Sequence, residues 1–348
     1  MNTGSSNLGK VDFSGVSRRK FLCQSGVAVG SVVLGSQDVW AEPSAGASTA
    51  AQGLPQRILG KTKVPVSVLT LGTAPCGQSK VFSSRQVADI VNAAVDEGIN
   101  FIDTARIYGC AEEGIGLALG RRRKEVFLAT KVWADTIKDA EERFGESLKL
   151  LKTEQVDLLY FQSLGNHDVV RARQADGVFN WLLKQKQLGK TRFLGVSGHN
   201  GVGKFPAFVE SGDVDVVLMV LNFVDRHIYN FEEKVLPLAR KHNLGVVAMK
   251  VFGGVRGGFA SYGGPQAPSQ LDAQYLELAV RYSLGLPGVA TVNIGVHDVD
   301  QIRKNVRMVK NFRPLSAEEQ TLLDGVGREL AKKWGPHFGP VGENGDGV

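Results

Sequence analysis

The feature that most limits the possible folds is a regular alternation of strand-like and helix-like segments. Short runs rich in Val, Leu, Ile and Phe recur eight times, and segments with helical spacing lie between them. Continuous apolar runs are typical of parallel strands that are covered on both faces. Eight strand–helix units over ~250 residues predict an α/β fold, the (β/α)8 or TIM barrel. The strand-like runs are residues 66–73, 100–105, 125–132, 156–162, 191–198, 214–222, 244–252 and 289–296.

A doubly wound open sheet is the main alternative fold. That fold binds dinucleotides through a G-x-G-x-x-G turn after its first strand, and no such motif follows the first run. The preceding segment QRILGKTKVPVSV has the pattern of a short hairpin. We therefore expect residues 56–330 to form a barrel whose bottom is closed by an N-terminal β-hairpin.

The first 41 residues have the pattern of an export signal. Paired arginines, Arg18 and Arg19, precede a mildly apolar stretch from Gly26 to Gly35, and a small-x-small site ends at Ala41. The stretch is too short to span a bilayer, and S-R-R-x-F-L resembles a twin-arginine signal, which is an address and not an anchor. We expect residues 1–41 to engage the twin-arginine export machinery and the protein to be periplasmic or otherwise exported, without a stable membrane anchor.

Two further segments contain little that could pack. Residues 42–55 are mostly Ala, Ser, Gly, Gln and Pro, and residues 331–348 are rich in Gly and Pro. Such compositions predict a flexible linker and a flexible C-terminal tail.

Charge and cysteine content argue against two other classes of protein. The net charge of +6 is spread along the chain, and the basic run GRRRKE is typical of an exposed helix end, so no nucleic-acid partner is expected. Cys23 lies in the export signal, and no Cys/His group has metal-ligand spacing, so no metal is expected. Cys76 and Cys110 follow neighbouring strands, where free thiols and a disulfide in an oxidising compartment are both open.

Polar side chains stand at the carboxyl ends of several predicted strands. In a barrel these ends converge on the face that carries the chemistry. Asp103 and Tyr108 follow the second run, and Lys131 lies near the end of the third. A nearby ammonium lowers the pKa of a phenol, while a carboxylate holds the lysine charged and in place. The three residues together predict a proton donor for a carbonyl oxygen. Other polar or small residues at strand ends are Gln162, Ser197, Asn222, Lys250 and Gly295.

From about Arg57 to Leu330 the chain resembles the aldo-keto reductase family. The similar segments are FIDTARIYGCAEEGIGLAL, VFLATKV, VDLLYFQ, GKTRFLGVSGHN, VDVVLMVLNFVDR and TVNIGVHDVDQIRKN. The resemblance implies hydride transfer between a nicotinamide cofactor, NADP(H) or NAD(H), and a small-molecule carbonyl or alcohol. It also implies that Tyr108 is the general acid, Lys131 modulates its pKa, and Asp103 is the orienting carboxylate.

The resemblance also implies where the cofactor binds. Ser197 would face the carboxamide of the nicotinamide, while Gly295, Gln301 and Asn305 would hold the pyrophosphate and adenine end. Asn222 is assigned to the same cofactor site.

The roles of two basic residues, Lys250 and His297, in ligand binding are not decided by the sequence. Lys250 is expected to reach cofactor phosphates or a substrate carboxylate, with a solvated lysine and a Schiff-base lysine as alternatives. His297 stands where the family often has Lys or Arg for the 2′-phosphate. Because neutral histidine is a weak phosphate partner, the choice between NADP(H) and NAD(H) stays open.

The chain departs from the family pattern at three positions. Gln162 replaces the catalytic histidine, and glutamine can donate a hydrogen bond but cannot carry a proton. Gly198 and Leu218 replace residues that contact the carboxamide. His167 and His199 are alternative histidines for the gap, or ordinary loop residues. These departures keep a second hypothesis open, in which a weakened dinucleotide-binding barrel acts as a binding or sensor module.

Overall fold

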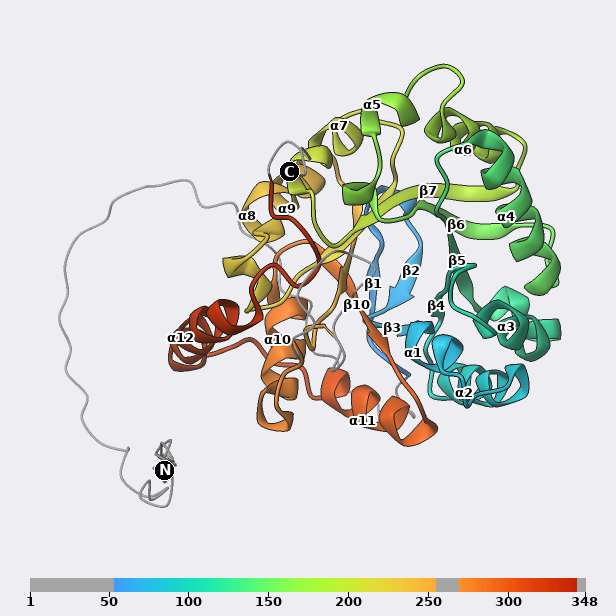
Figure 1. The fold of residues 1–348 in the computed structure, drawn as a ribbon. Helices are drawn as coiled ribbons and strands as arrows, with labels where there is room; N and C mark the ends of the chain where they lie inside the picture. The colour runs from blue at the N-terminus through green and yellow to red at the C-terminus, as the bar shows by residue number, and fades with distance from the viewer. Residues whose placement is uncertain (1–52, 255–268, 343–348) are drawn as a thin grey trace, which may run out of the picture. The chain divides into compact units, whose positions relative to one another are not determined.

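A computed structural model describes residues 53–254 and 269–342 of the protein, which contain a closed barrel of eight parallel strands (Figure 1). The order round the barrel is β10-β3-β4-β5-β6-β7-β8-β9, so the last strand closes on the first. Each of the eight predicted runs supplies one of these strands, which confirms the (β/α)8 class. The strands are β3 (Leu69–Gly72), β4 (Phe101–Asp103), β5 (Phe127–Val132), β6 (Val156–Phe161), β7 (Thr191–Gly198), β8 (Val216–Val220), β9 (Gly245–Met249) and β10 (Val289–Gly295).

Helices surround the strands, as Figure 1 shows. The first long one, α2, begins with a capping box in which the Ser83 hydroxyl accepts from the Gln86 N–H and the Gln86 side chain accepts from the Ser83 N–H. Its apolar residues, such as Val87 and Val91, recur at helical spacing and are buried against the barrel. The other helices are α1 (Ala74–Gln78), α3 (Ala111–Leu119), α4 (Ile137–Leu150), α5 (Val169–Ala172), α6 (Val178–Gln187), α7 (Pro206–Val209), α8 (Phe231–Lys234), α9 (Leu236–Lys241), α10 (Leu276–Gly285), α11 (Val299–Lys310) and α12 (Ala317–Trp334), with α2 spanning Ser84–Asp96.

The expected hairpin lies at the amino ends of the strands. It pairs β1 (Gln56–Ile58) with β2 (Pro65–Ser67) in antiparallel register. Arg57 donates to the carbonyl oxygen of Val289, where β10 begins, at 2.7 Å. The Lys61 N–H donates to the carbonyl oxygen of Asn243, just before β9. The hairpin therefore closes the bottom of the barrel, and the first predicted run is divided between β2 and β3.

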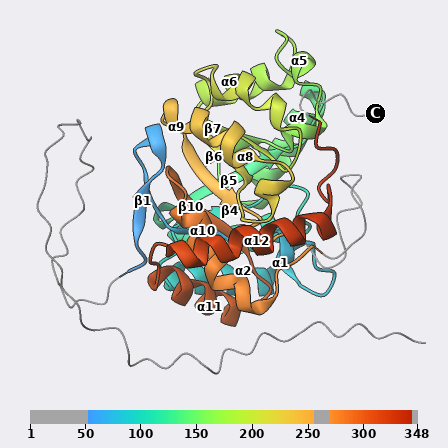
Figure 2. The same ribbon diagram turned by 90° about the vertical axis from the view of Figure 1, so that its left-hand side faces the viewer.

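The C-terminal region differs from the expected flexible tail. Helix α12, for which no helix was predicted, begins at a Ser316–Glu319 capping box and continues to Trp334, past the predicted boundary at residue 330. Figure 2 shows α12 running along the outside of the barrel near α10, to which Arg281 and Glu319 connect it by an ion pair. Beyond the helix, Phe338 is fully buried. The structure therefore differs from this expectation between residues 331 and 339, where α12 continues to Trp334 and the side chains of His337 and Phe338 are buried.

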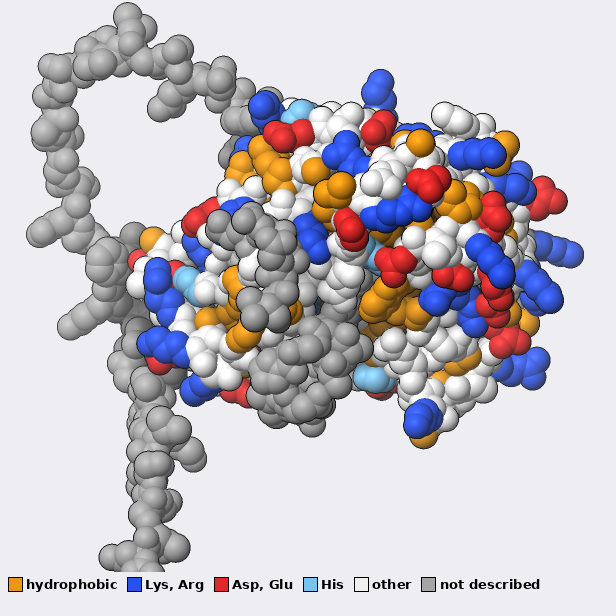
Figure 3. All heavy atoms as spheres, turned by 45° about the horizontal axis from the view of Figure 1, so that its top comes forward, with side chains coloured by type: hydrophobic (Ala, Val, Ile, Leu, Met, Phe, Trp, Pro, Cys, Tyr) orange, Lys and Arg blue, Asp and Glu red, His pale blue; other side chains and the backbone are white. Residues whose placement is uncertain are grey.

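The N-terminal predictions fall mainly on residues that the structure does not describe. Residues 1–52, which contain the predicted export signal and most of the linker, are outside the described range. Leu54 is buried and the Pro55 carbonyl accepts from the Val68 N–H, so packing begins before the predicted end of the linker. Within the described residues, no helix is long and apolar enough to cross a membrane. On the face in Figure 3, basic and acidic side chains are interspersed.

Candidate active site

A cavity of about 740 Å³ lies at the carboxyl ends of the barrel strands. Its walls come from the segments that follow β3, β4, β7, β9 and β10, as expected for a barrel of this class. Most of the site residues predicted from the sequence face it. Those that line it are Asp103, Tyr108, Lys250, Gly295, His297, Gln301 and Asn305.

Asp103, Tyr108 and Lys131 come together at one end of the cavity. The Lys131 ammonium donates to Asp103 Oδ1 at 2.5 Å and to the carbonyl oxygen of Thr104 at 2.7 Å. The same nitrogen lies 5.0 Å from the centroid of the Tyr108 ring. Asp103 and Lys131 are both almost fully buried, so the ion pair is fixed behind the tyrosine.

Strand register explains this arrangement. Asp103 at the end of β4 lies opposite Ala129 of β5, and Lys131 is two residues further on, so it points to the same side as Ala129. Tyr108 is placed by a tight turn whose next residue, Gly109, has φ of 53°. A Cβ at Gly109 would lie 2.3 Å from the carbonyl oxygen of Gly77, so this turn requires glycine.

The electrostatics of Tyr108 differ from the expectation. Burial, with a further contribution from the Asp103 carboxylate, raises the pKa of the Tyr108 phenol. The net lowering of this pKa that was predicted is therefore not seen, although the Lys131 ammonium lies over the ring. Tyr108 is therefore a protonated hydrogen-bond donor at neutral pH.

Gln162 and His167 lie outside this cavity. Gln162 is buried at the end of β6, where its N–H donates to the carbonyl oxygen of Val132, and it is not among the described residues that line the cavity. His167 Nε2 donates to the Gln162 carbonyl oxygen at 2.9 Å, and its Nδ1 lies 2.6 Å from Asp135 Oδ1. His167 is thus held by its neighbours away from the described cavity lining.

His199 lies in the cavity instead. It follows β7 directly and lines the same space as Asp103 and Tyr108. Burial first, then the nearby charges of Lys250 and Lys131, lower its pKa well below the ordinary value, so the imidazole is neutral. From the sequence, His167 and His199 were both candidates for the gap left by Gln162. Of the two, His199 is the one that lines the described cavity.

The replacement at Gly198 has a steric cause. A Cβ at this position would lie 2.8 Å from Cζ of Phe205, so a larger residue would require that buried ring to move. Leu218, the other replaced position in this region, lines the cavity with an apolar side chain.

Ser197 and Asn222 are engaged within the protein. The Ser197 hydroxyl accepts from the N–H of Ser163 at 3.3 Å. Asn222 donates to Asp225 Oδ2 and to the carbonyl oxygen of Lys250, and its side-chain oxygen accepts from the N–H of Asp225. Neither residue is among the described lining of the cavity, and the structure gives both a role in fixing loops.

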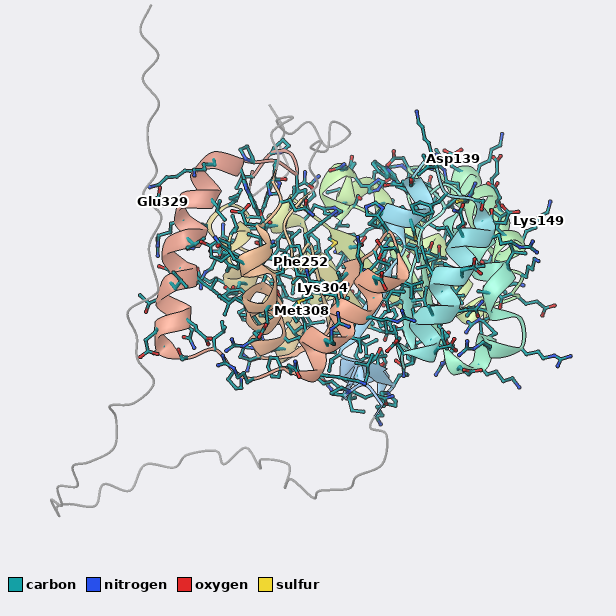
Figure 4. The ribbon with its side chains drawn as sticks, turned by 90° about the horizontal axis from the view of Figure 1, so that it is seen from below. Asp139, Lys149, Phe252, Lys304, Met308 and Glu329 are labelled. Atoms are coloured by element: carbon teal, nitrogen blue, oxygen red, sulfur yellow. The ribbon has the colours of Figure 1, made fainter. Side chains whose placement is uncertain are left out.

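The far end of the cavity is formed by one face of α11. Gln301, Lys304, Asn305 and Met308 line it at the i, i+3, i+4, i+7 spacing of a helix face. Figure 4 labels Lys304, Met308 and Phe252, and all three line the cavity. Lys304 was not predicted, although its helical spacing from Gln301 is a signal that could have identified it.

The residues present fit a dinucleotide. Asp103 Oδ2 is buried without a hydrogen-bond partner among the described residues, so it is an acceptor available to a ligand. A Cβ at Gly295 would lie 2.5 Å from Pro75, which shows how closely the backbone forms the cavity wall. Lys304 offers a charge for a phosphate and Phe252 an apolar surface for a base.

The two described cysteines are free. Cys76 is fully buried, and burial raises the pKa of its thiol to about 11. No group of three or more His, Cys, Asp and Glu side chains within residues 53–254 and 269–342 is arranged to hold a metal ion.

Comparisons with known proteins agree with this geometry. The model of the aldo/keto reductase family matches residues 68–270. An uncharacterized oxidoreductase, YqkF, of Bacillus subtilis is 26% identical in an alignment of 301 residues that covers 76% of this chain and 94% of that protein. L-galactose dehydrogenase of Arabidopsis thaliana is 28% identical in an alignment of 305 residues that covers 77% of this chain and 92% of the relative. The holo form of the aldo-keto reductase AKR11C1 from Bacillus halodurans superposes with a TM-score of 0.62 at 25% identity, covering 82% of this chain and 99% of that one. The chain belongs to the aldo/keto reductase family.

Proposed function

We propose that this protein is an NAD(P)-dependent oxidoreductase in which Tyr108 is the proton donor to a carbonyl substrate, or the acceptor in the reverse direction. The observation that carries the proposal is the placement of Tyr108 and Asp103 on the wall of one cavity, with the Lys131–Asp103 ion pair behind the ring. The nicotinamide cofactor supplies or accepts the hydride when it is bound. The protein supplies the proton and the electrostatic environment.

The roles of the three residues follow from their contacts. Burial keeps Tyr108 protonated, so it can donate to a carbonyl oxygen that becomes more basic as the carbonyl carbon is reduced. The Lys131 ammonium, 5.0 Å from the ring centroid, stabilises the phenolate that remains. Asp103 holds Lys131 by the 2.5 Å hydrogen bond and so fixes its position.

The cofactor is proposed to extend along the cavity toward α11. Gly295, His297, Gln301, Lys304 and Asn305 line that end and would hold the pyrophosphate and adenosine. The Gln301 side chain accepts from the N–H of His297 at 2.9 Å, which fixes this loop. NADP(H) and NAD(H) both remain candidates, and Lys304 is the residue that would separate them.

The proposal includes the cellular location. We infer that residues 1–41 direct the folded protein to the periplasm or another exported compartment by the twin-arginine route. Arg18 and Arg19 followed by Phe21 and Leu22 support this inference.

The test of the catalytic proposal is the Tyr108→Phe substitution. NADPH and NADH oxidation would be measured with a panel of aldehydes and ketones, and dinucleotide binding would be measured separately by the fluorescence of the bound reduced cofactor. We expect the variant to bind the dinucleotide and to lose turnover. Turnover equal to that of the unaltered protein would exclude Tyr108 as the proton donor.

The second candidate is a binding or sensor module. The position of Gln162 outside the described cavity lining favours it, since the family's fourth catalytic group is then missing from the site. A protein that binds a dinucleotide tightly but reduces no carbonyl in the panel would support this candidate against the enzyme.

A further inference from the structure

The wall of the cavity opposite the Asp103–Lys131 pair is formed by three neighbouring strands. Leu218 lies in β8, and His199 and Lys250 directly follow β7 and β9; all three line the cavity. Leu218 is apolar and Lys250 is a cation, so His199 is the residue of the three that can donate a hydrogen bond without bringing a charge. Because Tyr108 lines the same cavity, a carbonyl group placed beside the tyrosine would share that space with His199.

The environment of His199 favours the neutral imidazole. Burial and the charges of Lys250, Lys131 and His337 all lower its pKa. A neutral imidazole carries one N–H, which can donate to a carbonyl oxygen, and it does not add a third cation beside the two lysines. Neutral histidine is known to polarise a carbonyl in this way in triosephosphate isomerase, another barrel enzyme.

The position of the His199 ring is supported by the C-terminal segment. The ring centroids of His199 and Phe338 are 5.2 Å apart. Phe338 is held in turn by its own N–H, which donates to the Tyr229 hydroxyl at 2.7 Å, and that hydroxyl donates to the Gly339 carbonyl oxygen at 3.0 Å. The adjacent His337 contacts Asp225 at 2.8 Å, with both side chains fully buried. A donor fixed in advance costs little reorganisation during a reaction.

We propose that His199 is a catalytic residue that orients and polarises the substrate carbonyl by donating a hydrogen bond to its oxygen, next to Tyr108. This inference rests on the proposed function. In the reduction, the hydride adds to the carbonyl carbon, and the π electrons of the C=O bond move to the oxygen. That oxygen takes the Tyr108 proton, and Tyr108 regains a proton from solvent. His199 stabilises the charge on the oxygen and keeps its own proton.

The experiment compares His199→Leu, His199→Gln and His167→Gln, each in the full chain of 348 residues. The substrates are 4-nitrobenzaldehyde and 4-methoxybenzaldehyde, which differ in how much their carbonyl groups need polarisation. His199→Leu should lower kcat/KM by about 100-fold or more, with a larger loss for the methoxy compound. His199→Gln, which retains a donor, should recover part of the rate. His167→Gln removes a histidine from the loop after β6, outside the described cavity lining, and should lower kcat/KM much less.

Two further readouts separate a catalytic role from a structural one. Binding of NADPH, followed by its fluorescence, should be unchanged in His199→Leu. Unchanged binding would show that the variant is folded and that its cofactor site is intact. In protein labelled with 15N-histidine, the unreactive analogue 4-methoxybenzamide should shift a ring nitrogen resonance that is absent from the His199→Gln spectrum.

The outcomes distinguish the two proposals. If the unaltered protein reduces neither aldehyde nor any other carbonyl, the proposed function fails and this inference fails with it. If the unaltered protein is active and His199→Leu has the same kcat/KM, only the role of His199 is overturned. The same conclusion follows if the substitution lowers kcat/KM by an equal factor for both aldehydes.

Discussion

At the scale of single residues, the cavity contains two lysines with different surroundings. Lys250 lies on the same wall as His199 and is partly buried, whereas Lys304 lies on the exposed part of α11 beside Gln301 and Asn305. An exposed lysine such as Lys304 costs little to keep charged, while the desolvation of Lys250 penalises its charged form. We therefore expect Lys304 to affect the choice of ligand and Lys250 to affect the stability of the fold.

Lys304 is predicted to distinguish the two dinucleotides. The 2′-phosphate is the group in which they differ, and a charge-assisted hydrogen bond to it is worth about 1.5–3 kcal/mol. Lys304→Gln should therefore raise the Kd for NADPH about 10-fold or more and leave that for NADH nearly unchanged. Titration of cofactor fluorescence measures both, with Lys310→Gln on the same helix as the control. An equal loss for the two cofactors would show that Lys304 does not bind the 2′-phosphate.

Lys250 is predicted to destabilise the fold in a pH-dependent manner. Burial, with the charge of Lys131 adding to it and Asp225 opposing it, lowers the pKa of Lys250 to about 8. Unfolded, the same group titrates near ~10.4. The unfolded chain thus binds more protons between these pH values, and the free energy of unfolding rises with pH across that window. The penalty is complete below pH 8.

The substitution Lys250→Met tests this directly. It should raise the free energy of unfolding by about 2–3 kcal/mol at pH 7, because it keeps the side-chain volume and removes the charge. Urea denaturation should show a smaller gain at pH 9.5, where the parent protein has already released the proton. Equal gains at both pH values would point to packing instead of charge.

At the scale of secondary-structure elements, the strands could be predicted and the loops could not. The proximity of Asp103 and Lys131 could be predicted because each residue lies near the carboxyl end of its strand. Their strands, β4 and β5, are consecutive in the sequence and are neighbours in the barrel. Whether His167 or His199 faces the cavity depends on loop contacts. His167 is held by Asp135, and His199 packs on Phe338, which is far away in the sequence. No local pattern encodes such a contact.

Helix α12 and the segment after it show the same limit. The Ser316–Glu319 capping box is a readable start signal, yet the Gly and Pro content beyond Trp334 resembles that of a flexible tail. The buried side chains of His337 and Phe338 hold part of this segment on the barrel. The composition of a segment is an average, so it does not reveal that two residues within it, His337 and Phe338, are buried against the barrel.

Tyr229 is predicted to couple this segment to the site. Tyr229→Phe removes both hydrogen bonds of the hydroxyl and leaves the Phe338 N–H and the Gly339 carbonyl unpaired. We expect the free energy of unfolding to fall by about 1–3 kcal/mol and kcat to fall as the support for His199 loosens. Denaturation and steady-state kinetics measure the two effects. Tyr275→Phe is the control, since its hydroxyl makes no hydrogen bond within the described part of the chain; equal effects of both substitutions would contradict the coupling.

At the scale of the whole molecule, the cavity exists only when the barrel is closed. β10 pairs with β3, although more than two hundred residues separate them, and the hydroxyl oxygens of Thr70 and Thr291 lie 2.8 Å apart across this seam. The walls of the cavity come from the ends of both strands. A dinucleotide can therefore bind in this cavity only after the last strand has been added, so cofactor loading follows folding.

This order of events predicts what export should deliver. If residues 1–41 are a twin-arginine signal, the protein is expected to leave the cytoplasm folded and already loaded. Protein purified from the exported fraction should release about one dinucleotide per chain on denaturation, and mass spectrometry would identify it as NAD(H) or NADP(H). Arg18→Lys together with Arg19→Lys should retain the loaded protein in the cytoplasm. An exported protein that is empty and binds neither dinucleotide would contradict both the loading order and the proposed oxidoreductase, because the cavity would then have no source of hydride.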